Sequence, residues 1–176
     1  MKILLILLII LLPWATAYAE EGVAGISVSL DKAHEAKQKQ KDEIDQYITD
    51  FSLLYDVDPD LVRAVMSGES EGVIRAFNEN DNGTTDHGLM QINSCNHEWL
   101  EKELGITDWY DPRQNIQAGT YMLSLLSDKY GDLHKVLMAY NMGEGRMREL
   151  WSEGITSSKY SCKVMGKFNQ LKEGVK

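Results

Sequence analysis

The chain has 176 residues, of which 43% are hydrophobic and 26% are charged, a composition typical of a soluble globular protein. Its formal net charge of −9 argues against a nucleic-acid partner, because proteins that bind phosphate backbones usually carry a basic surface. The length allows one domain with a substantial core and rarely two, so we expect a single folded domain.

The N-terminus has the features of a secretory signal. Lys2 precedes an apolar run from Ile3 to Leu12, and Ala17-Tyr18-Ala19 has the A-x-A pattern of a cleavage site. We therefore predict a signal peptide over residues 1–19 and an exported protein that acts in the periplasm, the cell wall or the extracellular space. An uncleaved anchor is the alternative, although the apolar stretch is just short of a comfortable bilayer span.

A polar spacer is expected to separate this signal from the folded domain. Residues 20–43 are rich in Lys, Gln and Glu and should be helical only toward their end, and the domain should occupy residues 44–176. Apolar side chains at helical spacing predict an amphipathic helix that ends around Tyr55, with a buried face made of Ile44, Tyr47, Ile48 and Phe51.

The next predicted helix carries an unusual carboxylate. It should run from Pro59 to about Ser67–Ser70, since Asp58 can cap its first amides and proline suits the first helical position. Spacings of three, one and three place a carboxylate on an otherwise apolar face, made of Val62, Val65, Met66 and Glu69. A desolvated carboxyl that keeps its proton near neutral pH suits acid catalysis of glycoside cleavage. The alternative is an ordinary solvated glutamate at a helix end.

Residues that form turns dominate the segment that follows. A small β-hairpin or loop is expected between Gly72 and Gln91, and Asn82-Gly83 is the favoured pair for a two-residue hairpin turn. Such a hairpin would fold Asp86 and Gln91 back over Glu69.

Two partial metal-binding patterns occur, and each lacks an essential ligand. The stretch 78–83 fits the opening of a calcium loop, but Leu89 stands where that loop needs a bidentate glutamate. The stretch 97–101, HEWLE, is one histidine short of a zinc-protease helix. We predict no metal and no other cofactor.

Three further helices are predicted in the second half of the chain. Asp111 should cap a long helix over 112–130, and Asp132 should cap the next, which would end in a turn at 141–145. A last helix is expected over about 157–171.

The only two cysteines, Cys95 and Cys162, are predicted to form a disulfide, because exported proteins fold in oxidising compartments. Two separate thiols are the alternative, since a bridge requires a close approach that sequence cannot show.

Three motifs occur in order along the chain: Glu69-Ser70, GLMQIN at Gly88–Asn93, and AYNMGEG at Ala139–Gly145. Together they resemble the signature of lytic transglycosylases (SLT domains) of the lysozyme-like superfamily, in its invasion- and conjugation-associated branch, over about Ile48 to Phe168. The resemblance implies a mainly α, lysozyme-like fold with a small hairpin region. It also implies cleavage of the β-1,4 bond between N-acetylmuramic acid and N-acetylglucosamine in peptidoglycan, with formation of 1,6-anhydromuramic acid.

The resemblance also implies roles for individual residues. Glu69 would be the catalytic acid, and substrate would be bound by Ser70, Gln91, Asn93, Tyr140 and Asn141. Asn115 would help to hold the cleft, although an ordinary surface asparagine fits the sequence equally well. Asp86 follows Glu69 by seventeen residues, where animal-type lysozymes place a second carboxylate, so it is a candidate second catalytic residue.

Two alternative functions stay open at this point. If Asp86 faces Glu69 at about 5–6 Å, the pair suits a hydrolytic lysozyme, since retaining glycosidases use two carboxyl groups. A non-catalytic glycan-binding assembly protein would keep the cleft and not need the acid. The expected partners are peptidoglycan glycan strands and a secretion or conjugation machine, and the protein is expected to be a monomer.

Overall fold

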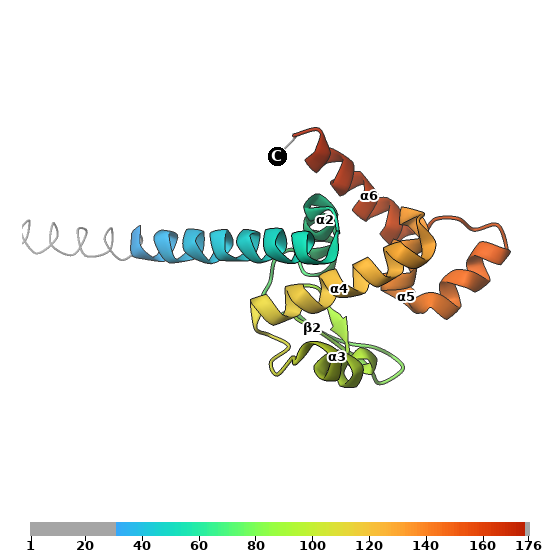
Figure 1. The fold of residues 1–176 in the computed structure, drawn as a ribbon, viewed down its shortest axis with the longest axis horizontal. Coiled ribbons are helices and arrows are strands. Elements are labelled where there is room, and N and C mark those ends of the chain that lie inside the picture. Colours follow the sequence, from blue (N-terminus) through green and yellow to red (C-terminus); the bar gives the residue numbers. More distant parts are fainter. Residues whose placement is uncertain (1–30, 175–176) are drawn as a thin grey trace, which may run out of the picture. The chain divides into compact units, whose positions relative to one another are not determined.

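The computed structural model describes residues 31–174 (Figure 1). The chain divides into two units, residues 1–43 and 44–176. The described part of the first unit, 31–43, is helical, and the second unit begins with a helical segment over 44–55. The predicted signal peptide lies outside the described residues. No helix in the described range is both long enough and apolar enough to cross a membrane.

Capping residues fix where the helices of the second unit begin. The side chain at each of four N-caps accepts a backbone N–H of the first turn; the four are Asp58, Asp111, Asp132 and Ser158. The helices are α2 (Pro59–Glu69), α3 (His97–Leu104), α4 (Pro112–Tyr130), α5 (Leu133–Ser152) and α6 (Lys159–Lys172). The predicted starts of α2, α4 and α5 are confirmed, and α6 begins within two residues of its predicted start.

Two helical segments differ from the sequence prediction. Helix α3 was not expected, and α5 continues beyond the turn predicted at 141–145. Only Gly143 leaves the helical conformation there, with φ 78° and ψ 152°. The chain then resumes a helix because Met147, Leu150 and Trp151 pack in a small separate core around Met138.

A three-stranded antiparallel sheet follows α2 and carries Asp86 on its central strand. Its strands lie in the order β1 (Phe77–Glu79), β2 (Thr85–His87) and β3 (Ile92–Asn93). Asp86 pairs with Asn78 on one side and with Asn93 on the other, so it occupies the centre of the sheet. A short 3-10 helix, η1 (Ser94–Asn96), leads from β3 into α3.

The predicted two-residue hairpin turn is wrong. Backbone hydrogen bonds join Gly83 N to Asn80 O at 2.9 Å and Asn80 N to Thr84 O at 2.8 Å. They close a three-residue loop over 81–83 in which Gly83 adopts a left-handed conformation with φ +80°. Such loops are the next most common hairpin connection, and the extra residue shifts the strand register from the one a two-residue turn would give.

The main hydrophobic core is built from all the helices of this unit and from the GLMQIN segment. Its fully buried members include Ile48, Val62, Val65, Leu89, Met90, Leu100, Ile116, Leu123, Leu137 and Val164. Burial of each such side chain contributes about 1.5–3 kcal/mol. A Cβ at Gly119 would lie 2.7 Å from Met90 Cβ, so this glycine lets α4 pack directly on the motif.

Candidate active site

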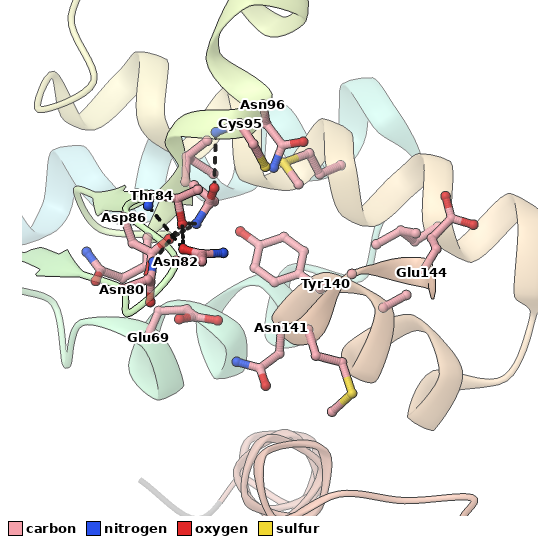
Figure 2. Close-up of a pocket in the computed structure, with 18 of the residues that line it drawn as sticks. Glu69, Asn80, Asn82, Thr84, Asp86, Cys95, Asn96, Tyr140, Asn141 and Glu144 are labelled. Atoms are coloured by element: carbon pink, nitrogen blue, oxygen red, sulfur yellow. Dashed lines mark hydrogen bonds between the residues drawn. The ribbon is translucent and has the colours of Figure 1, made fainter. Parts of the chain in front are cut away.

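A cleft of about 840 Å³ runs between the sheet and the helices α4 and α5. Six of the seven residues predicted to act in catalysis or substrate binding line it: Glu69, Asp86, Gln91, Asn93, Tyr140 and Asn141. In Figure 2, Glu69 and Asp86 lie on one side of the Tyr140 ring and Glu144 lies on the other. The sheet supplies polar groups to the cleft wall near Glu69, while α4 supplies Met122, Leu125 and Leu126.

Glu69 is the last residue of α2 and has an unusual protonation equilibrium. The pKa of its carboxyl is raised from 4.5 to about 7. Desolvation is the main cause and the negative charge of Asp86 adds to it, while a hydrogen bond from Tyr160 and the charge of Lys163 act against it. Close to neutral pH the side chain can therefore both give and take a proton.

Tyr160 on α6 contacts the acid directly, and none of the three sequence motifs contains it. Its hydroxyl donates to Glu69 Oε1 at 2.5 Å. Burial and the neighbouring Glu69 raise the pKa of the Tyr160 phenol far above its usual value, so this hydroxyl remains a donor. The contact requires a close approach of α2 and α6, since a Cβ at Gly68 would lie only 3.0 Å from Val164 Cγ2.

Asp86 is held by three asparagine amides. Its Oδ1 accepts from Asn93 Nδ2 at 2.6 Å, and its Oδ2 accepts from Asn80 at 2.9 Å and from Asn78 at 3.2 Å. Asn93 also donates to Thr84 Oγ1 at 2.9 Å. The position of Asp86 is thus fixed by neighbours on β1, on β3 and in the loop that follows β1. The role of Asn78 and Asn80 was missed because their sequence context suggested only a turn or a failed calcium loop.

Asn115 secures the backbone of the GLMQIN segment from α4. Its side chain is fully buried, accepts from Met90 N at 2.7 Å, and donates to His87 O and Trp109 O at 2.9 Å each. A Cβ at Gly88 would lie 2.4 Å from Asn115 Nδ2, and Gly88 has φ +77°. Glycine is therefore the one residue that fits this contact. The surface alternative for Asn115 is wrong, and the residue acts through the backbone that carries Gln91.

Two more hydroxyls hold the same backbone from other sides. Ser70 donates to Leu89 O at 2.7 Å and Tyr140 donates to Met90 O at 2.9 Å. Gln91 between these anchors has φ 47°, and its amide donates to Gly88 O at 2.9 Å. The three motifs thus meet as one hydrogen-bonded assembly around the cleft.

Residues 46–160 match the family model described as the Transglycosylase SLT domain. The chain belongs to this family. The three sequence motifs lie within this match, so the motifs and the family model agree on a transglycosylase SLT domain.

Named relatives of this SLT domain come from a phage and from bacteria. It is 37% identical over 120 residues to a transglycosylase of Enterobacteria phage PRD1, covering 68% of this chain and 41% of that protein. It is 30% identical over 123 residues to the invasion protein IagB of Salmonella typhi, covering 68% of this chain and 73% of that one. The chain thus spans less than half of the phage protein and about three quarters of the invasion protein.

Solved structures of the same fold include two larger enzymes. The 70 kDa soluble lytic transglycosylase of Escherichia coli aligns with a TM-score of 0.59 at 20% identity, over 73% of this chain and 24% of that one. An inactive mutant of lytic transglycosylase Slt from Pseudomonas aeruginosa aligns with a TM-score of 0.57 at 18% identity, over 74% and 24%. The predicted mainly α, lysozyme-like fold is confirmed.

Ser70 differs from its predicted role in the SLT cleft. The side chain is 8% exposed, does not line the cleft, and is bonded to the backbone of Leu89. Gly72 N also donates to its hydroxyl, at 3.2 Å. Ser70 therefore holds the segment that carries Gln91, and it does not reach the substrate space.

The predicted disulfide is not formed in this structure. Cys95 and Cys162 are both exposed free thiols. Cys95 lines the cleft, whereas Cys162 on α6 borders a separate hollow beside α2. The prediction rested on the number of cysteines alone, and the two elements that carry them do not bring the thiols together. Within residues 31–174, no cluster of three or more His, Cys, Asp and Glu side chains could hold a metal ion.

Proposed function

We propose that this SLT domain is a lytic transglycosylase that cleaves the β-1,4 bond between N-acetylmuramic acid and N-acetylglucosamine in peptidoglycan. The observation that carries the proposal is Glu69, a half-buried carboxyl that lines a large cleft and whose desolvation raises its pKa to about 7. A carboxyl in this state is half protonated near neutral pH, which suits a group that must act as acid and then as base.

The reaction needs only one such group, because the substrate supplies the nucleophile. Glu69 donates its proton to the glycosidic oxygen as the bond to the anomeric carbon breaks, and positive charge develops on the muramic acid ring. The resulting Glu69 carboxylate then accepts the proton of the C6 hydroxyl of the same sugar. That oxygen bonds to the anomeric carbon, which yields a 1,6-anhydro ring, restores the protonated acid and consumes no water.

Asp86 has an electrostatic role in this scheme. Its carboxylate raises the pKa of Glu69 and faces the cleft in which the positive sugar forms. The amides of Asn78, Asn80 and Asn93 keep it in place, so it stabilises charge without forming a bond to the sugar.

The remaining cleft residues are proposed to bind the sugars. Gln91 offers its amide oxygen from the sheet side of the cleft, since its nitrogen is bonded to Gly88 O, and Asn141 offers an exposed amide from α5. Asn93 lines the cleft too, but its nitrogen already donates to Asp86 and Thr84, so only its amide oxygen can take a further bond. Tyr140 contributes its ring, since its hydroxyl is bonded to Met90 O. The sugar ring would thus be held by hydrogen bonds on one side and by aromatic contact on the other.

A single digest tests the chemistry. Purified peptidoglycan is incubated with the wild type, with Glu69→Gln and with Asp86→Asn, and the soluble fragments are measured by mass spectrometry. Products lighter by one water than hydrolytic fragments, absent with Glu69→Gln and reduced only modestly with Asp86→Asn, support the proposal. Reducing-end products from the wild type, with a folded but inactive Asp86→Asn, would instead establish a lysozyme. Binding without any release of fragments would indicate a glycan-binding assembly protein.

The same proposal includes export and an associated machine. The support is the apolar N-terminal run that ends in Ala17-Tyr18-Ala19, together with the likeness to a protein named for invasion. Expression of the full gene followed by fractionation and N-terminal sequencing should give a protein outside the cytoplasm that begins at Glu20. An unprocessed chain in the cytoplasm would refute this part of the proposal. Co-purification of a secretion or conjugation complex under native conditions tests the partner.

A further inference from the structure

Helix α6 has a charge pattern that contrasts with the rest of this acidic protein. The chain has 27 acidic and 18 basic residues, yet between Glu153 and Glu173 it has four lysines and no acidic residue. Three of them recur every four residues, at Lys159, Lys163 and Lys167, and therefore share one face of α6. This lysine face, residues 159, 163 and 167, is a local basic surface in a protein of net charge −9.

The lysine face borders a hollow of about 330 Å³ between α2 and α6. Ser67 and Gly68 line it from α2, and Lys163, Lys167 and Gln170 line it from α6. Small side chains on α2 leave this space open, while lysine stems form its other wall. The hollow is separate from the cleft that contains Glu69.

Within the domain's described residues, none of the three lysines forms a salt bridge, so their charges are not neutralised by an acidic neighbour. Within residues 44–174, salt bridges involve other basic groups: Arg63, Lys129, Arg146, Arg148 and Lys172. Lys172 lies on the same helix and contacts Asp58 Oδ2 at 2.8 Å. Lys163 Nζ lies 3.4 Å from the carbonyl oxygen of Gly68, so one ammonium already points across the hollow.

The hollow and the catalytic cleft lie at the same end of α2. Gly68 borders the hollow, and Glu69, the next residue, borders the cleft. The charge of Lys163 is close enough to affect Glu69, since it lowers the pKa of that carboxyl. Whatever is attached to a sugar beside Glu69 can therefore come within reach of the lysine face, whereas the other cleft walls carry Asp81, Asp86 and Glu144.

We propose that the lysine face binds the carboxylates of the peptide stem on the muramic acid beside the scissile bond, so that the domain prefers stem-bearing to bare glycan. The proposal rests on the proposed function, which places a muramic acid next to Glu69. The glycan chain is neutral where its lactyl groups are joined to peptide, and the free carboxylates of the stem are its negative charges. A lysine side chain carries a point charge at the end of a flexible aliphatic chain, so it can follow a peptide that is itself flexible.

Binding to two matched substrates tests this preference independently of catalysis. The full chain carrying Glu69→Gln is sedimented with intact peptidoglycan and with the same strands after an amidase has removed the stems. We expect tighter binding to the intact strands by about 2- to 30-fold, the range for two exposed ion pairs. The ratio should approach one as the salt concentration rises, because such pairs are screened.

The lysines are then replaced in that background. The Lys163→Gln/Lys167→Gln double variant should lose most of the preference and should bind bare strands as before. Lys172→Gln is the matched control, since it removes the same charge from the same helix and should keep the preference. Thermal unfolding of each variant verifies that α6 is intact.

Three outcomes would overturn the inference. They are equal binding to intact and bare strands, a preference that survives the double substitution, and a preference lost equally in the Lys172→Gln control. Binding of the lysine face to vesicles with anionic lipid, without discrimination between the two glycans, would assign the surface to a membrane and also overturn it. Failure of the proposed function looks different, because the wild type would then release no anhydro fragments from either substrate while the binding preference would be unaffected.

Discussion

Replacing Glu69 by glutamine should change how the stability of the protein depends on pH. In the folded protein the pKa of this carboxyl rises from 4.5 to about 7, mainly because it is buried. The folded state therefore binds the proton more tightly than the unfolded chain does. The stabilisation that this provides is complete below pH 4.5, is lost as the pH rises toward 7, and is absent above 7.

The size of the effect follows from the same two values. One pKa unit corresponds to about 1.4 kcal/mol, so the rise from 4.5 to about 7 amounts to about 3 kcal/mol. Glutamine has nearly the shape of the protonated acid and can still accept the Tyr160 hydroxyl, but it does not ionise. The variant should match the wild type near pH 4 and be more stable by about 3 kcal/mol at pH 8.5.

Urea unfolding of both proteins at a series of pH values between 4 and 8.5 measures this difference. Other groups also titrate in this range, including His87 and His97, whose burial lowers their pKa values. These groups are common to both proteins, so their contributions cancel in the difference, provided that the free energy of unfolding has the same slope against urea concentration in both. A constant difference across the pH range would refute the reasoning, because it would mean that Glu69 titrates as an exposed carboxyl.

Three other substitutions test the contacts around the site. Tyr160→Phe removes the hydrogen bond to Glu69, and a bond to a charged group contributes about 1.5 kcal/mol. The pKa of Glu69 should therefore rise, and the alkaline limb of the pH–rate profile, measured from initial rates, should move up by about one pH unit. An unchanged limb would contradict this. Asn115→Ala leaves buried backbone groups unpaired and should lower the free energy of unfolding, measured in urea, by at least about 3 kcal/mol. The control Asn169→Ala, at an exposed position, should lower it by less than about 0.5 kcal/mol. Gly68→Ala places a Cβ 3.0 Å from Val164, so it should lower the free energy of unfolding by about 1–3 kcal/mol and also reduce activity. Gly166→Ala adds a Cβ with no atom within 4 Å and should not destabilise α6. Similar melting curves for the two glycine variants would show that α2 and α6 tolerate a wider spacing.

Local signals in the sequence predicted most of the fold. An aspartate followed by proline starts both α2 and α4, because the carboxylate and the fixed proline φ act within one turn. The apolar face of α2 was enough to predict a desolvated Glu69. The break at Gly143 was read as the end of a helix, since a glycine in that stretch carries no information about the tertiary packing of Met147 and Trp151 that restarts it.

The candidate site was only partly predictable, because its hydrogen bonds join distant segments. Tyr160 is 91 residues from Glu69, and its position in an apolar stripe with Val164 made it look like an ordinary core residue. Ser70 was predicted to bind substrate because it follows Glu69 in the motif, but at the end of α2 its hydroxyl donates to Leu89 O. Hydrophobic periodicity predicts which face of a helix is buried, but it does not predict which element packs against that face.

The position of Glu69 at the C-terminal end of α2 has an electrostatic consequence of its own. The aligned peptide dipoles of a helix sum to about half a negative charge at this end, and they disfavour another negative charge there by roughly 0.3–1 kcal/mol. The helix end and the burial of the side chain therefore act in the same direction, and both keep the proton on Glu69 until a sugar oxygen takes it. Once the proton has left, the same backbone dipoles attract the positive charge that develops on the sugar. At the opposite end of a helix the same carboxyl would be held as an anion, and it would be a poor proton donor.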